Sequence, residues 1–199
     1  MTVAHRIQQA IRNLALGLLS AAFFGCASST LPPTEKLDPK TGVTLTFSST
    51  PMVLYRDNPS QAAFARNLVS LGPLQVNRGG RFEYFLWLGI WNTNQTASVA
   101  DRRNGFDSIV LFINGEPLPL ELNGWTPDAI GASEPVYSQP VTSALDAYYR
   151  VTADQIRLIA NSDDIQLRTT GFTPRNFESW DDQTAARESF RLFLSSVVY

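Results

Sequence analysis

Cysteine and histidine are almost absent from this chain, which has one of each, Cys26 and His5. A single cysteine cannot form an intramolecular disulfide. Beyond residue 26 the chain contains neither residue type, which excludes a Ser-His-Asp triad, a Cys-His pair and zinc sites built from imidazole or thiolate there. We therefore expect no metal site, no cofactor and no catalytic residue of these kinds.

Positive charge is also scarce, because Lys36 and Lys40 are the only lysines. Without Arg6 and Arg12, 14 basic residues face 18 acidic ones, and the arginines are dispersed among acids. Binding of the phosphate backbone requires clustered positive charge. The sequence therefore predicts no nucleic-acid partner.

Long hydrophobic runs are missing as well. The longest apolar stretch lies between Leu14 and Gly25, after a start that carries Arg6 and Arg12. A helix that crosses about 30 Å of hydrocarbon needs roughly 20 apolar residues, and this run is too short. The order of a charged start, a short apolar run and small residues is typical of an export signal.

The end of this run, Phe23-Phe24-Gly25-Cys26, resembles the lipobox of a bacterial, Gram-negative type lipoprotein signal peptide. The resemblance implies removal of residues 1–25 and attachment of acyl chains such as palmitate to Cys26, which would anchor the protein to a membrane. In such lipoproteins an aspartate after the cysteine signals inner-membrane retention. Ala27 and Ser28 stand there instead, which implies the outer membrane, facing the periplasm.

A second processing pattern competes with lipidation. Gly25 and Ala27 are small residues at the spacing of an ordinary export cleavage site. Cleavage after Ala27 would discard Cys26 and release an unmodified protein. Both outcomes remain open from the residues alone.

Residues 26–42 contain prolines and small polar residues without any hydrophobic period. This composition predicts a flexible tether behind the acylated cysteine. The remaining residues, 43–199, are numerous enough and apolar enough for one globular domain. We expect that domain to be rich in β structure.

The clearest strand covers residues 81–92. Leu86, Leu88 and Ile90 alternate with Phe85 and Trp87, so both faces are apolar and the strand should be covered on both sides. Gly89 lies between Trp87 and Trp91 on the same face, where it either marks a bend or leaves space for an aromatic ring. This pattern predicts a central strand rather than an edge.

A β-hairpin is predicted at Asn114-Gly115, since this dipeptide readily takes the positive φ angles of a tight turn. Pro117 and Pro119 predict that the second arm is an edge strand, because proline cannot donate to a ladder. Thr152 and Gln155 have capping-box spacing, which predicts a helix from Ala153 to about Asn161.

A second helix should follow Asp181-Asp182, with one apolar stripe formed by Ala186, Phe190, Phe193, Leu194 and Val197. The expected fold is therefore mainly β with two helices (α+β). It is predicted to be an antiparallel β-sandwich-like domain covered by C-terminal helices.

Three aromatic residues are candidate contacts for a ligand or partner. Trp125 and Tyr137 lie in the long Gly-, Pro- and Ser-rich loop of residues 123–142, and Trp180 lies in turn-like surroundings. Long loops of this kind usually bind or cover something. Flat aromatic rings suit a sugar or a peptide.

Two functional hypotheses follow. The first is a lipid-anchored envelope protein with a non-catalytic binding or assembly role, whose partners are the membrane and an envelope protein or glycan. The second is a carboxylate-dependent hydrolase or binding module for cell-wall glycan, suggested by the acid pairs Asp163/Asp164 and Asp181/Asp182. A helix start and a turn explain the acid pairs equally well.

Overall fold

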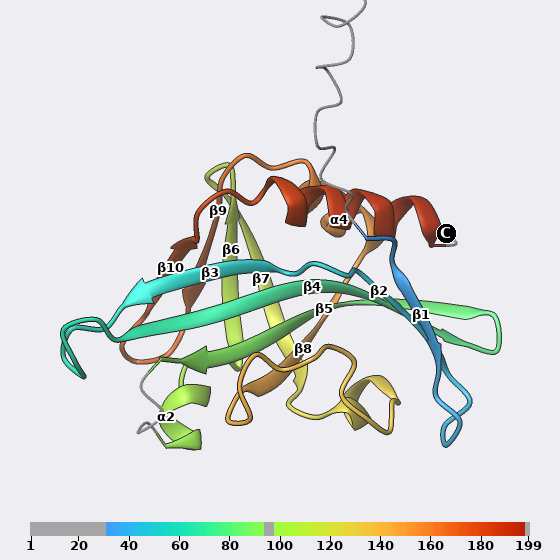
Figure 1. The fold of residues 1–199 in the computed structure, drawn as a ribbon, viewed down its shortest axis with the longest axis horizontal. Helices are drawn as coiled ribbons and strands as arrows, with labels where there is room; N and C mark the ends of the chain where they lie inside the picture. The colour runs from blue at the N-terminus through green and yellow to red at the C-terminus, as the bar shows by residue number, and fades with distance from the viewer. Residues whose placement is uncertain (1–30, 94–97, 198–199) are drawn as a thin grey trace, which may run out of the picture.

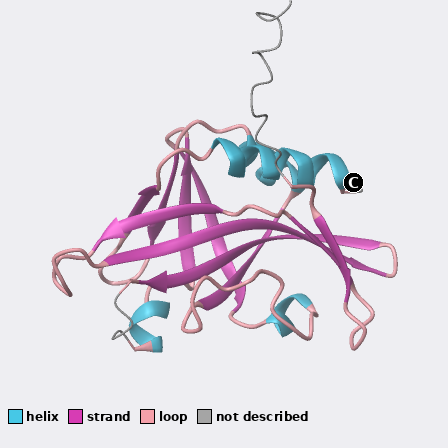
Figure 2. Cartoon of the chain, in the orientation of Figure 1, coloured by secondary structure: helices cyan, strands magenta, loops and turns pink. Residues whose placement is uncertain are grey.

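A closed antiparallel β-barrel forms the body of the protein (Figures 1 and 2). The computed structural model describes residues 31–93 and 98–197. Around the barrel the strands follow the order β4-β3-β10-β9-β6-β7-β8-β5, and β5 pairs with β4 again to close it. The strands are β3 (Met52–Asp57), β4 (Arg66–Arg78), β5 (Arg81–Asn92), β6 (Ser108–Ile113), β7 (Glu116–Gly124), β8 (Leu145–Val151), β9 (Ile165–Thr169) and β10 (Asn176–Ser179).

The mainly β composition with helices agrees with the sequence, but the predicted sandwich is wrong. A sandwich consists of two separate sheets, whereas here one sheet curls until β5 pairs with β8 on one edge and β4 on the other. Alternation of apolar residues reveals which faces are buried. It does not reveal which distant strand completes the sheet, so the two architectures look alike in the sequence.

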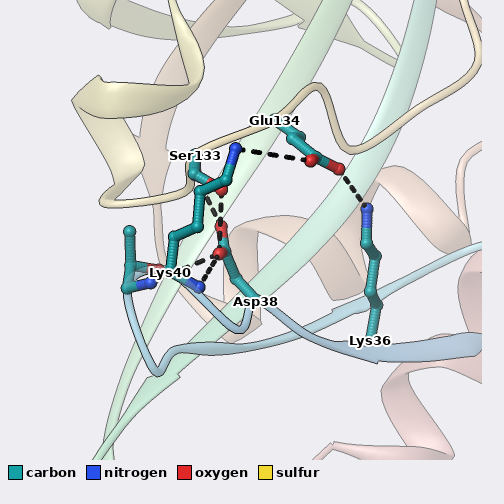
Figure 3. Close-up of polar contacts among 6 residues, drawn as sticks. Lys36, Asp38, Lys40, Ser133 and Glu134 are labelled. Atoms are coloured by element: carbon teal, nitrogen blue, oxygen red, sulfur yellow. Dashed lines mark hydrogen bonds and ion pairs between the residues drawn. The ribbon is translucent and has the colours of Figure 1, made fainter.

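The predicted flexible tether of residues 26–42 is also corrected. Within it, Thr34–Leu37 form strand β1, which pairs with β2 (Thr44–Phe47), and β2 pairs with the C-terminal half of β4. The turn of this hairpin is held by Asp38, which is 3% exposed. Figure 3 shows its carboxylate facing Ser133, whose hydroxyl donates a hydrogen bond of 2.8 Å. Residues 26–30 lie outside the described residues.

Both faces of β5 are buried, as its alternation predicted. Leu86, Leu88 and Ile90 point into the barrel and join the main core. Phe85 and Trp87 point outward into a second core, which the segment between β7 and β8 covers. That second core consists of Val43, Leu45, Leu74, Val76, Phe85, Trp87, Ile130, Ala132, Val136, Tyr137 and Tyr148.

Two helices close one end of the barrel (Figure 1). The helix α3 (Ala153–Ala160) begins at Thr152 with the predicted capping box to Gln155. The helix α4 (Thr184–Ser196) buries Ala186, Phe190, Phe193 and Leu194 of its predicted stripe, so both helix predictions are confirmed. The short helix α2 (Val99–Arg103) and the 3₁₀ turn η1 (Pro127–Ile130) lie in connections.

The predicted Asn114-Gly115 turn joins β6 to β7, with φ angles of 51° and 86°. The predicted edge position of β7 is wrong, because its far end pairs with β8 at Leu122 and Gly124. The segment with the two prolines pairs only with β6, as the missing N–H groups require. Among the described residues no helix is long and apolar enough to cross a membrane.

Candidate functional site

The end of the barrel opposite α3 and α4 carries a layer of polar side chains that point inward. Along β3, Met52 and Leu54 are buried in the core, and the alternation places Arg56 on the same inward face at the end of the strand. Asn67 on β4 and Asn92 on β5 occupy corresponding positions above core residues. We call this end the barrel mouth.

A cavity of about 250 Å³ lies at the barrel mouth. Its apolar wall includes Ile90, Phe106 and Phe177, which belong to the main core. Its polar lining residues include three arginines and only one acidic residue. These residues are Arg56, Arg102, Arg175 and Asp101. We call this space the arginine cavity; it is large enough for one small polar group but below the usual size of a drug-like site.

Arg175 is held in place by the segment that contains α2. Its guanidinium donates to the backbone carbonyls of Asp101 and Arg102, each at 3.5 Å, and to the carbonyl of Asn104. The guanidinium carbon also lies 5.0 Å from the ring centre of Phe106. Arg175 is therefore fixed on one side by carbonyl oxygens and on the other by an aromatic face.

The positive charge of the arginine cavity is not neutralised by ion pairs. Burial lowers the pKa of Arg175, and the nearby charge of Arg56 lowers it further, while Asp101 acts in the opposite direction. Within the described part of the chain, none of Arg56, Arg102 and Arg175 forms a salt bridge with a carboxylate, and the side chain of Arg56 also has no hydrogen bond. An anion placed between these groups would relieve their repulsion.

Among the described residues, several buried polar atoms without a hydrogen-bond partner belong to residues that line the arginine cavity. Three of the residues that line the arginine cavity carry such atoms, namely Trp91 Nε1, Asn92 Oδ1 and Arg102 Nε. Leaving a buried donor or acceptor unpaired costs about 1–3 kcal/mol. Asn92 is only 3% exposed, so this cost falls on a side chain that the fold fully encloses.

The structure does not bring the three predicted aromatic contacts together. Tyr137 is buried and stacks on Trp87, with ring centres 4.3 Å apart, so the expected surface contact is wrong for this residue. Its hydroxyl donates to the carbonyl of Pro73 at 2.7 Å. Tyr137 therefore holds the loop of residues 123–142 against the barrel.

Trp125 and Trp180 are half-buried on different parts of the surface. Trp125 lies beside α2, where the guanidinium of Arg103 stands 4.8 Å from its ring. Trp180 packs edge-on against Tyr55, with ring centres 5.1 Å apart. They do not form the shared platform that a sugar chain would need.

The acid pairs have structural roles. The amide groups of Asp163 and Asp164 both donate to Asn114 Oδ1 at 3.0 Å, which fixes a turn. Asp182 accepts from the amide of Thr184 at 2.8 Å, and hydrogen bonds from Thr184 lower its pKa. A glycosidase acid needs a raised pKa, which this environment does not provide.

The comparisons with known proteins identify no relative. No protein-family model, no curated protein and no solved structure matches this chain.

The arginine cavity was not identified from the sequence, although a signal for it was present. In β3, β4 and β5 the inward apolar alternation ends in a polar residue, namely Arg56, Asn67 and Asn92. Each of these residues alone resembles an ordinary solvated strand end. Only the closure of the barrel shows that all three point into one space.

Proposed function

We propose that this protein is a lipoprotein of the bacterial cell envelope whose barrel domain binds an anionic group and catalyses no reaction. Cys26 would carry the acyl chains, and the outer membrane, facing the periplasm, would be its location. Support for the anchor comes from the order of residues before Cys26. Two or three acyl chains, at about 0.8 kcal/mol for each buried CH₂, would hold the protein on a bilayer.

The arginine cavity is the observation that carries the binding proposal. Three arginines and one aspartate are among the residues that line this small space, and the described residues offer the arginines no ion pair. Guanidinium groups bind carboxylate and phosphate oxygens through paired hydrogen bonds. A phosphate or carboxylate group is therefore the expected ligand.

Mass spectrometry of the protein isolated from membranes tests the anchor. We expect the mature chain to begin at Cys26 with a diacylglyceryl group, and the Cys26→Ser variant to lose incorporation of a labelled palmitate analogue. An unmodified chain that begins at Ser28 would contradict the proposed anchoring.

Thermal unfolding with inorganic phosphate tests the cavity. Binding to the native state alone stabilises it by about 2.7 kcal/mol at a hundredfold excess over the dissociation constant. We expect phosphate to raise the melting temperature of the wild type but not of Arg56→Gln. Arg81→Gln, which removes an exposed arginine outside the cavity, should respond as the wild type does.

A glycan hydrolase built on Asp181 and Asp182 is the alternative. It predicts turnover of purified cell-wall glycan that the Asp181→Asn and Asp182→Asn variants abolish. The Thr184 hydrogen bonds that lower the pKa of Asp182 favour the binding proposal instead.

A further inference from the structure

Two phenylalanine side chains project from the barrel mouth into solvent. Phe64, in the connection between β3 and β4, is 92% exposed, and Phe172, in the connection between β9 and β10, is fully exposed. Their neighbours in these connections, Gln61 and Thr173, line the arginine cavity. Both phenylalanines therefore stand on the rim of the anion site.

The two loops lie next to each other around the rim. Strand β3 lies between β4 and β10 in the barrel, and Tyr55 of β3 pairs with Glu178 of β10. The loop that follows β3 and the loop that precedes β10 consequently occupy the same sector. Two almost completely exposed phenylalanine rings in one sector are unusual for a surface that contacts only water, because apolar surface is unfavourable there.

The outer flank of β3 and β10 continues this sector with amphipathic side chains. Tyr55 and Trp180 pack edge-on, and the guanidinium of Arg66 lies 4.6 Å from the ring of Trp180. Tyrosine, tryptophan and arginine are the residues that favour the interface between lipid and water. Glu178 shares this face, which places the flank among headgroups and leaves only the loop tips to enter hydrocarbon.

The first described residues, from Leu31 onward, meet the domain at the other end of β3. The carbonyl of Pro32 accepts from the hydroxyl of Ser49, and the amide of the next residue, Thr50, donates to Ser189 of α4 at 3.1 Å. The chain from Cys26 to Leu31 can reach at most about 18 Å, and the six residues of β3 extend over a similar length. One bilayer surface can therefore meet both ends of β3.

We propose that the barrel lies on the bilayer that holds its anchor, with Phe64 and Phe172 inserted between lipids and the phosphate of an anionic phospholipid in the arginine cavity. This rests on the proposed function, since it names the source of the anion bound there. The apolar rim explains why that source is a membrane lipid: a free phosphate makes no use of two exposed phenylalanine rings.

Site-directed labelling of the lipidated full chain tests this arrangement. The sulfur of Cys26 is blocked by its thioether, so a single cysteine introduced at Phe64→Cys, Phe172→Cys or Leu158→Cys is the only free thiol. Leu158 lies on α3 and is 59% exposed. It lies beside Pro117 and Leu118 of β7, which is four strands from β3 in either direction around the barrel, so it faces away from the proposed bilayer and is the matched control. Each protein is reconstituted in vesicles of phosphatidylethanolamine and phosphatidylglycerol and labelled with a bimane fluorophore.

Interfacial side chains enter a bilayer by about 5–10 Å, so we expect iodide in the water to quench labels 64 and 172 at least about threefold less than label 158. Quenching of all three labels to the same extent overturns the membrane arrangement. Shielding that appears in intact envelopes but not in pure lipid vesicles also overturns it, because the rim would then bind a protein.

Thermal unfolding with inorganic phosphate distinguishes failure of the membrane docking from failure of the anion site. If inorganic phosphate raises the melting temperature of the wild type and the labels remain exposed to water, the anion site stands and only the membrane docking fails. If phosphate has no effect on the wild type, the anion site fails, and with it both the proposed binding function and the headgroup assignment.

Discussion

The ring of Tyr137 stacks on that of Trp87, with an interplanar angle of 16°, and so joins the loop of residues 123–142 to the outer face of β5. The hydroxyl of Tyr137 also lies 3.2 Å from the amide of Ser48, which donates to it. One side chain therefore connects three segments that are far apart in the sequence. The loop covers a second core, as its length suggested.

A substitution at Gly72 tests how closely this loop packs on the barrel. A Cβ atom at position 72 would lie 2.3 Å from Cζ of Tyr137, so Gly72→Ala must displace the ring. Overpacking of this kind costs about 1–3 kcal/mol of unfolding free energy, measurable by urea denaturation. In a Tyr137→Ala background the penalty should become much smaller, and equal penalties in both backgrounds would contradict the packing argument.

Asp146 should make the stability of the protein depend on pH, and it lies where the loop of residues 123–142 packs on β5. It is buried and accepts hydrogen bonds from Trp87 Nε1 at 2.9 Å and from Gln139 Nε2 at 3.1 Å, and burial raises its pKa. A carboxyl with a raised pKa in the folded state penalises the fold at neutral pH, and this penalty disappears as the pH falls and the group is protonated.

Asp146→Asn keeps an oxygen acceptor for Trp87 and removes the buried charge. We therefore expect the variant to be more stable than the wild type at pH 7, with a difference that narrows as the pH falls towards 4. Denaturant titrations at several pH values measure this difference. Asp154→Asn, at an exposed position on α3, is the control and should be no more stable than the wild type at pH 7.

For Asp38 we expect the opposite dependence of stability on pH. Hydrogen bonds to its carboxylate, first from the backbone of Ser133 and also from the Ser133 hydroxyl and the amides of Lys40 and Thr41, lower its pKa well below the ordinary value. A lowered pKa stabilises the fold at neutral pH, and the stabilisation is lost as the pH falls below about 4.

Asp38→Asn should therefore destabilise the β1–β2 hairpin at pH 7 and have a smaller effect in acid. Hydrogen exchange of the β1 and β2 amides reports this locally. Glu134→Gln, which removes exposed ion pairs to Lys36 and Lys40 in the same network, is the control and should change exchange little. Faster exchange in both variants to the same extent would contradict the role given to Asp38.

Substitution of Asn92 should change stability and phosphate binding in opposite directions. Its Oδ1 is buried and has no partner among residues 31–93 and 98–197, so Asn92→Leu removes an unsatisfied group and should raise the unfolding free energy by about 1 kcal/mol. The same change removes a polar group from the arginine cavity and should weaken phosphate binding. A loss of stability would show that Asn92 has a structural role, contrary to this account.

Local pattern was sufficient for several elements of the fold. The alternation in β5, the Asn114-Gly115 turn and the capping box of α3 depend on residues close together in the sequence, and each was predicted correctly. Of the two interpretations of Gly89, the structure supports the space for a ring, because a Cβ there would lie 2.6 Å from the ring of Trp87. Such features need no knowledge of distant partners.

The errors arise where distant contacts decide the structure. Residues 34–37 have a linker composition, yet Asp38 binds Ser133, 95 positions away, and the segment becomes a strand. The arginine cavity was missed for the same reason. Arg56 lies on β3 and Arg175 lies just before β10, and these segments meet only when the sheet closes. Tyr137 was misplaced because a long polar loop gave no sign of its packing on Trp87.

The position of a bound anion is the most direct test of the account. Arsenate is a phosphate analogue with an anomalous X-ray signal, so crystals of the protein grown with arsenate would locate it without ambiguity. We predict one strong anomalous peak in the arginine cavity, within hydrogen-bond distance of Arg56 or Arg175. Arsenate bound only elsewhere on the protein, with an empty cavity, would contradict the assignment of the arginine cavity as the anion site.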